Sequence, residues 1–168
     1  MINFEKLSTK FEVRTLVETD IPMILEVYKS NPLYFEHCPP SPTKETVRDD
    51  MFSLPPNKSI HDKYYLGFFD GEKLITVMDI IEAYPQTGTV FWGLFIMASH
   101  QSGKGLGSQI VEECISALKE QGFQSVRLSY MKTNPQSKAF WEKCRFNPTG
   151  VETNNGTGIA VVMERNLN

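Results

Sequence analysis

Residues 90–122, VFWGLFIMASHQSGKGLGSQIVEECISALKEQG, decide the fold. The segment opens with a nearly unbroken apolar run from Val90 to Met97, which predicts a buried strand. Three glycines at alternating positions follow, in Gly103-Lys104-Gly105-Leu106-Gly107. The next apolar residues recur with spacings of four, one, three, one and three, which places them on one helical face: Leu106, Ile110, Val111, Cys114, Ile115 and Leu118. The segment therefore predicts a strand, a glycine-rich loop and an amphipathic helix that ends at Gly122.

Periodicity and breaker residues predict the remaining elements. Upstream they are a strand at 11–17, a helix capped by Asp20 and running to about Ser30, a loop from Asn31 to Pro42, and a short helix opened by Ser41 or Thr43 and stopped by Pro55-Pro56. In the middle they are strands at 64–69 and 73–81 joined by a hairpin turn at Asp70-Gly71, and downstream a strand at 125–130, a helix at 134–144 and a strand at 158–164, with a further strand after Phe146.

These elements predict one α+β domain over residues 1–168. Its mixed, mostly antiparallel sheet is flanked by about four helices in the order β-α-α-β-β-β-α-β-α-β-β. Hydrophobic residues make up 40% of the chain and charged residues 22%, as in globular proteins that are soluble. Seventeen basic and twenty acidic side chains give a net charge of -3, which argues against a general nucleic-acid binder.

The N-terminal sequence has no long apolar run, so we expect neither a signal peptide nor a membrane span. Cys38, Cys114 and Cys144 are odd in number and widely spaced. They fit neither a disulfide framework nor a zinc site, and we expect no metal. A reducing cytoplasm is the expected location.

The glycine-rich loop is suited to an anion. Glycine lets the backbone turn sharply and approach a ligand, and the free N–H groups of the following helix point toward the loop. A phosphate or pyrophosphate fits there, with a further contact from Lys104. A helix start without any ligand has the same composition and stays an alternative. The loop lacks the spacing of the phosphate-binding NTPase motif, and the strands before it do not form the βαβ unit of a dinucleotide fold.

Two runs together resemble the GNAT family of N-acetyltransferases. Leu94-Phe95-Ile96 with Gly103-Lys104-Gly105-Leu106-Gly107 is similar to its acetyl-CoA signature, and the run from Asn134 to Phe146 is similar to its second cofactor motif. They lie in the family's order, with one helix and one strand between them. The resemblance implies acetyl-CoA as the cofactor and transfer of its acetyl group to a primary amine.

The resemblance also implies roles for single residues. Strand residues would offer backbone groups to the pantetheine arm, the loop would hold the pyrophosphate, and the asparagine-led helix would line the coenzyme. The implied cofactor-binding residues are Phe95, Ile96, Met97, Ser102, Gly103, Lys104, Gly105, Leu106, Gly107, Ser108, Asn134, Ser137 and Phe140.

The sequence departs from the family pattern at three places. Ser102 stands where the loop usually has Gln or Arg, with Gln101 one residue away. Trp141 stands where a tyrosine often protonates the leaving thiolate, and an indole cannot act as that acid. Arg145 replaces the usual glycine before Phe146.

The catalytic groups therefore have to be sought elsewhere. The strand before the loop offers no carboxylate, so Asp79 and Glu82 on the preceding strand are the candidate bases. Both could instead be solvent-facing strand charges. Tyr130, at the end of its strand, is the candidate acid, or no acid is needed because a thiol with a pKa of about 8.5 leaves readily.

The acceptor is expected to be a small-molecule or peptide amine. Tyr34, Phe35 and Glu36 combine aromatic faces with a carboxylate, which suits a cationic amine. These side chains could equally pack a loop over the core. A longer acyl group or a hydroxyl acceptor stays open, as does a non-catalytic acyl-CoA-binding or regulatory module. The resemblance also suggests a possible homodimer, while the net charge and the lack of a long apolar run predict no nucleic-acid or membrane partner.

Overall fold

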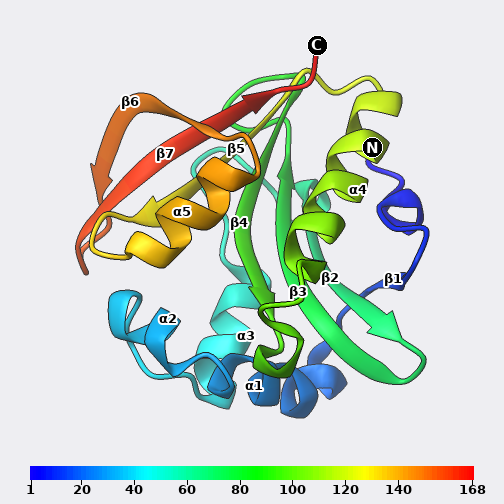
Figure 1. Ribbon diagram of the computed structural model, residues 1–168, viewed down its shortest axis with the longest axis vertical. Coiled ribbons are helices and arrows are strands. Elements are labelled where there is room, and N and C mark those ends of the chain that lie inside the picture. The colour runs from blue at the N-terminus through cyan, green and yellow to red at the C-terminus, as the bar shows by residue number, and fades with distance from the viewer.

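The computed structural model describes all residues from 1 to 168. Its centre is a seven-stranded sheet in the order β1-β2-β3-β4-β5-β7-β6 (Figure 1). The elements are β1 Glu12–Thr15, α1 Ile21–Lys29, α2 Pro32–His37, α3 Lys44–Phe52, β2 Lys63–Asp70, β3 Lys73–Glu82, β4 Thr89–Met97, α4 Leu106–Glu120, β5 Ser125–Met131, α5 Pro135–Lys143, β6 Asn147–Asn154 and β7 Ile159–Asn166. Short 3₁₀ turns lie at Phe4–Lys6, Glu18–Asp20, Ile60–Asp62 and Ser99–Gln101.

The sheet is antiparallel at every pair except β4 with β5, which is parallel. This confirms the α+β class and the mixed, mostly antiparallel sheet. The predicted order of elements is confirmed as well, apart from one additional helix, α2.

Helix α2 falls inside the segment that was predicted to be a loop. Prolines favour a loop in this segment, but Pro32 stands in the first turn of the helix, where its missing N–H costs nothing. The next helix begins as predicted: the hydroxyl of Thr43 accepts a hydrogen bond from Thr46 N at 3.2 Å.

Asp20 has a different role from the predicted side-chain cap of α1. Its carboxylate accepts bonds from Val17 N (2.8 Å) and from both terminal nitrogens of Arg14 (2.9 and 3.0 Å). It therefore stabilises the 3₁₀ turn before α1 and ties that turn to β1.

The core has two parts, one on each face of the sheet. Residues of α4 and α5 pack with one face in the larger cluster, and residues of α1 and α3 pack with the other face in the smaller one. In Figure 1, α4 and α5 lie in front of the sheet, while α1, α2 and α3 gather at its lower end. Strand β3 is buried along nearly its whole length because it contributes to both clusters.

Helix α4 follows the predicted pattern. All six apolar residues of the predicted face are buried, Cys114 among them. The helix ends at Glu120, and Gly122 adopts the expected left-handed backbone with φ of 89°. Neither α4 nor any other helix combines the length and apolar character that crossing a membrane requires.

Candidate functional site

Strands β4 and β5 form a wedge. Their parallel pairing covers only Thr89–Trp92 against Ser125–Leu128. Beyond these four pairs, β4 continues along β3 and β5 continues along β7. One edge of β4 from Gly93 onward therefore has no neighbouring strand.

The backbone of β4 presents polar groups to this wedge. Ala98 N donates to Ile75 O on β3 at 2.8 Å. Because such bonds alternate along an antiparallel pair, the N–H groups of Phe95 and Met97 lie on the opposite edge, toward β5. Asn31 Nδ2 donates to Met97 O at 2.9 Å across this edge.

Ile96 is not brought to the wedge. By the same alternation its backbone faces β3, and its side chain is buried in the cluster with α1 and α3. Of the three strand residues expected to contact the coenzyme, only Phe95 and Met97 direct backbone groups into the gap.

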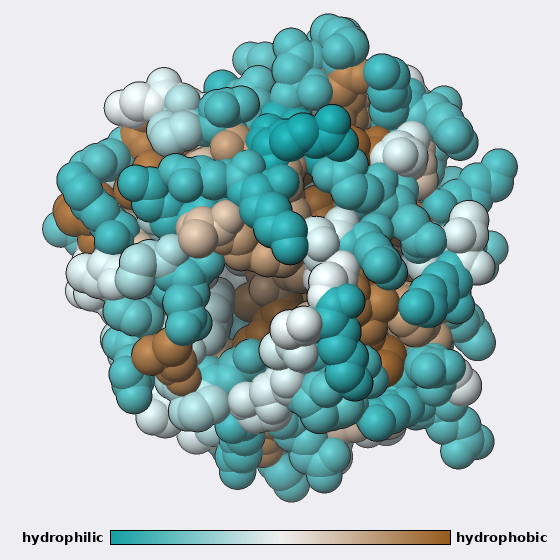
Figure 2. All heavy atoms as spheres, viewed as in Figure 1, coloured by the Kyte–Doolittle hydropathy of each residue, from teal (hydrophilic) through white to brown (hydrophobic).

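A cavity of about 470 Å³ lies at the wedge. Its walls come from α2, the diverging parts of β4 and β5, and α5. Figure 2 shows a hollow with hydrophobic walls near the middle of this face, surrounded by hydrophilic side chains. Asn134, Ser137 and Phe140 line the cavity, as the cofactor assignment requires, and so does Trp141.

Asn134 is the cap of α5. Its Oδ1 accepts a hydrogen bond from Ser137 N at 3.1 Å, and the residue is buried. The amide nitrogen makes no hydrogen bond within the protein, which leaves a donor beside the cavity. Asn134 therefore caps the start of α5 as predicted, and its amide N–H groups stay available to a ligand.

Trp141 occupies a packing position. Its ring centroid lies 4.8 Å from that of Phe140, 5.4 Å from Phe146, 5.7 Å from Phe95 and 6.1 Å from Trp92. The indole thus fills the centre of an aromatic cluster that fixes α5 against the wedge.

The glycine-rich loop has the conformation that an anion cradle requires. Gly103 and Gly105 have φ of 77° and 71°, in the left-handed region that favours glycine. The first backbone bond of α4 runs from Gln109 N to Gly105 O at 3.2 Å, so the N–H groups of 106–108 have no helical partner. No heavy atom outside the loop lies within 4 Å of a Cβ built on either glycine.

The other loop residues contribute unequally. Lys104 is exposed and forms no ion pair, which leaves its ammonium available. Ser102 N already donates to Ser99 O at 3.0 Å, so Ser102 could contribute only its side chain. A Cβ on Gly107 would stand 3.4 Å from Phe140 and 3.5 Å from Met97, at ordinary contact distance, so Gly107 lies where α4 packs against α5 and β4. The loop and wedge residues fit a coenzyme with a pyrophosphate and an extended arm.

Asp79 lies at the inner end of the wedge, in a second cavity of about 220 Å³. It is almost fully buried, and Lys63 Nζ donates to its Oδ2 at 2.9 Å. The same nitrogen is 2.9 Å from Oδ1, but that oxygen accepts no well-directed hydrogen bond. Burial raises the pKa of Asp79 to about 6, although the Lys63 ammonium acts in the opposite direction.

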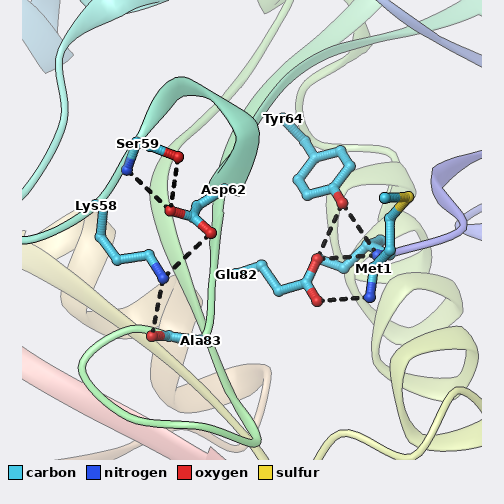
Figure 3. A network of polar contacts seen from close by, with 8 residues as sticks. Met1, Lys58, Ser59, Asp62, Tyr64, Glu82 and Ala83 are labelled. Atoms are coloured by element: carbon cyan, nitrogen blue, oxygen red, sulfur yellow. Dashed lines mark hydrogen bonds and ion pairs between the residues drawn. The ribbon is translucent and has the colours of Figure 1, made fainter.

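Glu82 lies away from both cavities. Its carboxylate accepts bonds from Ile2 N (3.0 Å) and Tyr64 Oη (2.9 Å) and pairs with the Met1 ammonium at 2.7 Å (Figure 3). Burial tends to raise the pKa of Glu82, but these partners together hold it below its usual value. The structure therefore assigns Glu82 to the anchoring of the N-terminal segment, and the suggestion that it is the base is corrected.

Tyr130 lines the larger cavity, as a leaving-group acid would need to. It is 8% exposed, and its hydroxyl forms no hydrogen bond within the protein. Of the predicted acceptor residues, Tyr34 and Phe35 line the smaller cavity, whereas Glu36 is exposed and lies on neither cavity wall. Glu36 lies on a different side of α2 from Tyr34, so the prediction that it lines the acceptor pocket is wrong.

The carboxylate that does reach the smaller cavity with Asp79 is Asp50, from α3. Tyr28 Oη donates to its Oδ2 at 2.9 Å. Sequence reasoning missed Asp50 because nothing in a polar run such as Arg48-Asp49-Asp50 tells which acid points inward. The weak signal is its position three residues after the buried Val47 and one before the buried Met51.

Comparisons with known proteins agree with this geometry. Residues 24–146 match the Acetyltransferase (GNAT) family. No curated protein matches the chain by sequence.

Several solved structures share the fold. An acetyltransferase from Thermus thermophilus superposes with a TM-score of 0.74 at 22% identity, over 94% of this chain and 97% of that one. The PaiA N-acetyltransferase of Thermoplasma acidophilum, in complex with coenzyme A, gives 0.66 at 18% identity over 93% and 98%. A spermidine N-acetyltransferase that is a chimera of the Vibrio cholerae protein and hSSAT gives 0.69 at 20% identity over 95% and 96%.

The family match covers more than half of the chain and includes the wedge, the glycine-rich loop and α5. On this evidence the chain is a member of the GNAT acetyltransferase family.

Proposed function

We propose that this protein is an N-acetyltransferase that transfers the acetyl group of acetyl-CoA to a primary amine by direct attack in a ternary complex. One arrangement carries the proposal: the wedge between β4 and β5 leads from the glycine-rich loop at the start of α4 to the carboxylate of Asp79. A donor and an acceptor can therefore meet at Gly93, which lines both cavities.

The donor side consists mainly of backbone groups. The free N–H groups of 106–108 and the ammonium of Lys104 would hold the pyrophosphate. The N–H groups of Phe95 and Met97 and the Asn134 amide would hold the pantetheine arm. Acetyl-CoA supplies an acetyl thioester. The amine nitrogen forms a C–N bond to the acetyl carbon, the C–S bond breaks, and coenzyme A leaves as the thiol.

Asp79 is the proposed base. An alkylamine with a pKa of about 10.4 is mostly protonated near neutral pH and cannot attack until it loses a proton. Asp79 is ionised above its pKa of about 6, so it can accept that proton, directly or through a water molecule.

Groups in the wedge would stabilise the negative charge that develops on the carbonyl oxygen and on the departing thiolate. As the amine attacks, negative charge develops on the carbonyl oxygen, and the Phe95 N–H is a fixed donor at the open edge of β4. Tyr130 is the proposed acid for the departing thiolate, since its hydroxyl lines the cavity without a partner in the protein. Placing both reactants in one wedge supplies the proximity part of the acceleration.

Two similar structures support the choice of substrates by their descriptions alone. One contains coenzyme A, and the other is described as a spermidine N-acetyltransferase. Their identities to this chain are 18% and 20%, so they support the class of reaction and leave the acceptor open.

Calorimetric titration with acetyl-CoA tests the donor site. We expect binding by the parent protein and its loss in Gly105→Glu, because a carboxylate in the loop repels the pyrophosphate. Gly150→Glu is a matched control: Gly150 also has positive φ and open space around it, but it lies in β6 outside both cavities. No binding by the parent, or equal binding by all three proteins, would overturn the assignment.

A non-catalytic acyl-CoA-binding module is the second candidate. The indole of Trp141 at the usual tyrosine position supports it, since no acid stands at that place. Release of free thiol in the presence of amines separates the two candidates. Acetyl-CoA binding without thiol release for any amine would favour the binding module.

A further inference from the structure

The smaller cavity adjoins the larger one and shares Tyr34, Cys38, Gly93 and Leu94 with it. Its other walls come from α3, from β3 and from the segment after α2. At about 220 Å³ it has room for a small aliphatic chain. A molecule in it would point one end at Gly93, where the two cavities meet.

The charges in this cavity do not balance. Asp50 and Asp79 both line it, and one ammonium group, that of Lys63, lies beside them. Lys63 is already engaged, because its Nζ donates to Ser53 O and to Asp79, each at 2.9 Å. Lys63 therefore neutralises Asp79, and the carboxylate of Asp50 is left without a cation in contact.

The surroundings of Asp50 leave it ready to bind a cation. Tyr28 Oη donates to Oδ2, while Oδ1 accepts no hydrogen bond from the protein. Burial raises the pKa of Asp50, while the Tyr28 hydrogen bond and the nearby Lys63 lower it. A half-buried carboxylate of this kind is stabilised when a positive charge comes into contact with it.

Aromatic rings complete the environment. Tyr34 and Phe35 line the cavity and contact each other edge to face, with centroids 5.0 Å apart. Phe35 also stacks on Tyr28 at 5.3 Å, which fixes its position. The faces of such rings stabilise alkylammonium groups, and the rings also pack against the methylene chains between those groups.

The second carboxylate of the cavity keeps some capacity to accept a hydrogen bond. Asp79 lines the cavity with its side chain 12% exposed, and its Oδ1 is paired with the Lys63 ammonium but accepts no well-directed hydrogen bond. One cationic group against Asp50 and one amine beside Asp79 would satisfy both carboxylates. The two acids come from different elements, α3 and β3, so they can hold the two ends of one molecule.

From this geometry we infer that the acceptor is a short aliphatic diamine, with its reacting nitrogen beside Asp79 and its second ammonium held by Asp50. This rests on the proposed acetyltransferase function. Asp50 is then the residue that distinguishes a diamine from a monoamine of equal length.

Steady-state rates with three matched amines test this assignment: 1,4-diaminobutane, n-butylamine and 4-amino-1-butanol. For the parent protein we expect kcat/KM for the diamine to exceed that for either singly charged amine at least tenfold, mainly through KM. In Asp50→Asn this ratio should fall to about threefold or less. The asparagine retains an oxygen for Tyr28, so the fold should persist, which thermal unfolding checks.

Asp49→Asn is the matched control. It removes the same charge from the neighbouring position of the same helix, but Asp49 is exposed and lines neither cavity. The diamine preference should stay within twofold of the parent. A preference that falls equally in both variants would mean a general surface charge effect and would overturn the role of Asp50.

Direct titration of the CoA-saturated protein with 1,4-diaminobutane gives a readout without chemistry. Binding by the parent and at least tenfold weaker binding by Asp50→Asn would support the assignment, even if no amine released thiol. That combination would overturn only the proposed transferase activity. Equal turnover of all three amines, or no diamine binding, would overturn the diamine assignment.

Discussion

A Cβ placed on Gly93 would stand 2.6 Å from Oδ2 of Asp79. The contact arises from a β-bulge: Asp79 pairs with Leu94 and Ile80 pairs with Trp92, so Gly93 is the extra residue on β4. The absence of a side chain at Gly93 is therefore what lets a carboxylate from β3 lie against β4. The bulge also stands where β4 begins to part from β5.

We predict that Gly93→Ala displaces the Asp79 carboxylate while the protein remains folded. The added methyl meets the end of a side chain rather than backbone, so the carboxylate can turn away. In steady-state assays kcat/KM should fall at least tenfold. In an Asp79→Asn background the same change should cost less than twofold, because the group it displaces has already lost its function.

The prediction is wrong if the effects of Gly93→Ala and Asp79→Asn on kcat/KM are additive in free energy. If Gly93→Ala lowers kcat/KM by the same factor with and without Asp79→Asn, the glycine matters for substrate access and not for the position of the carboxylate. Thermal unfolding of each variant separates a local effect from a loss of fold.

The activity should depend on pH through Asp79. The proposed base works only when ionised, so its contribution is present above its pKa of about 6 and is lost as the pH falls through that value. The ratio of kcat/KM for the parent to that for Asp79→Asn should be about 100 at pH 8 and decrease about tenfold per pH unit below pH 6. Using the ratio removes the titration of the amine itself, and a ratio independent of pH would exclude Asp79 as the base.

Glu82 is the internal control for this assignment, since both acids come from β3. Glu82→Gln should leave kcat/KM and its pH profile unchanged. It should lower the free energy of unfolding by about 1 kcal/mol, because the N-terminal ammonium, Ile2 N and Tyr64 share the lost charge. A loss of activity without a loss of stability would return Glu82 to the mechanism.

Tyr130→Phe tests the proposed acid. Removal of a hydroxyl with no partner in the protein should leave the free energy of unfolding within about 0.5 kcal/mol of the parent. We expect kcat to fall about tenfold while the affinity for acetyl-CoA measured by calorimetry stays the same. Unchanged kcat would mean that the thiolate leaves without help from this residue.

The sequence allowed most of the scaffold to be predicted, because its signals are local. The period change after Met97 predicted β4, the loop and α4, and the residues at Thr43 and Gly122 predicted where helices begin and end. Helix α2 was missed because a proline in the first turn of a helix looks the same in sequence as a breaker.

The acceptor side could be predicted only in part, because it depends on which strand positions meet in space. The bulge at Gly93 decides which part of β4 lies against Asp79, and a bulge shifts the register without a reliable sequence signal. Asp79 and Glu82 are three positions apart on one strand, so alternation places them on opposite faces, but the sequence does not tell which face carries the cavity. Asp50 belongs to a helix that meets β3 only in the folded chain, so its helical position gives only a weak signal.

Arg145, which stands where the family usually has glycine, has a strained backbone conformation. It adopts φ of 64°, the left-handed conformation for which glycine is suited, just after α5. This explains why a glycine would be expected there, and why an arginine costs about 1 kcal/mol. Its guanidinium donates to Glu112 at 2.7 Å, but the arginine side chain is 70% exposed and Glu112 retains Arg165 at 2.6 Å, so the pair offsets only part of that cost.

Arg145→Gly should therefore leave the free energy of unfolding equal to that of the parent or raise it by up to about 1 kcal/mol, because relief of backbone strain matches or exceeds the lost ion pair. Arg145→Ala loses the same ion pair but keeps the strained conformation, so it should be less stable than Arg145→Gly by about 1 kcal/mol. Urea denaturation of the three proteins measures both differences. Equal stability of the glycine and alanine variants would mean that the left-handed backbone at this position carries no strain, and that the arginine is retained for its contact with Glu112 alone.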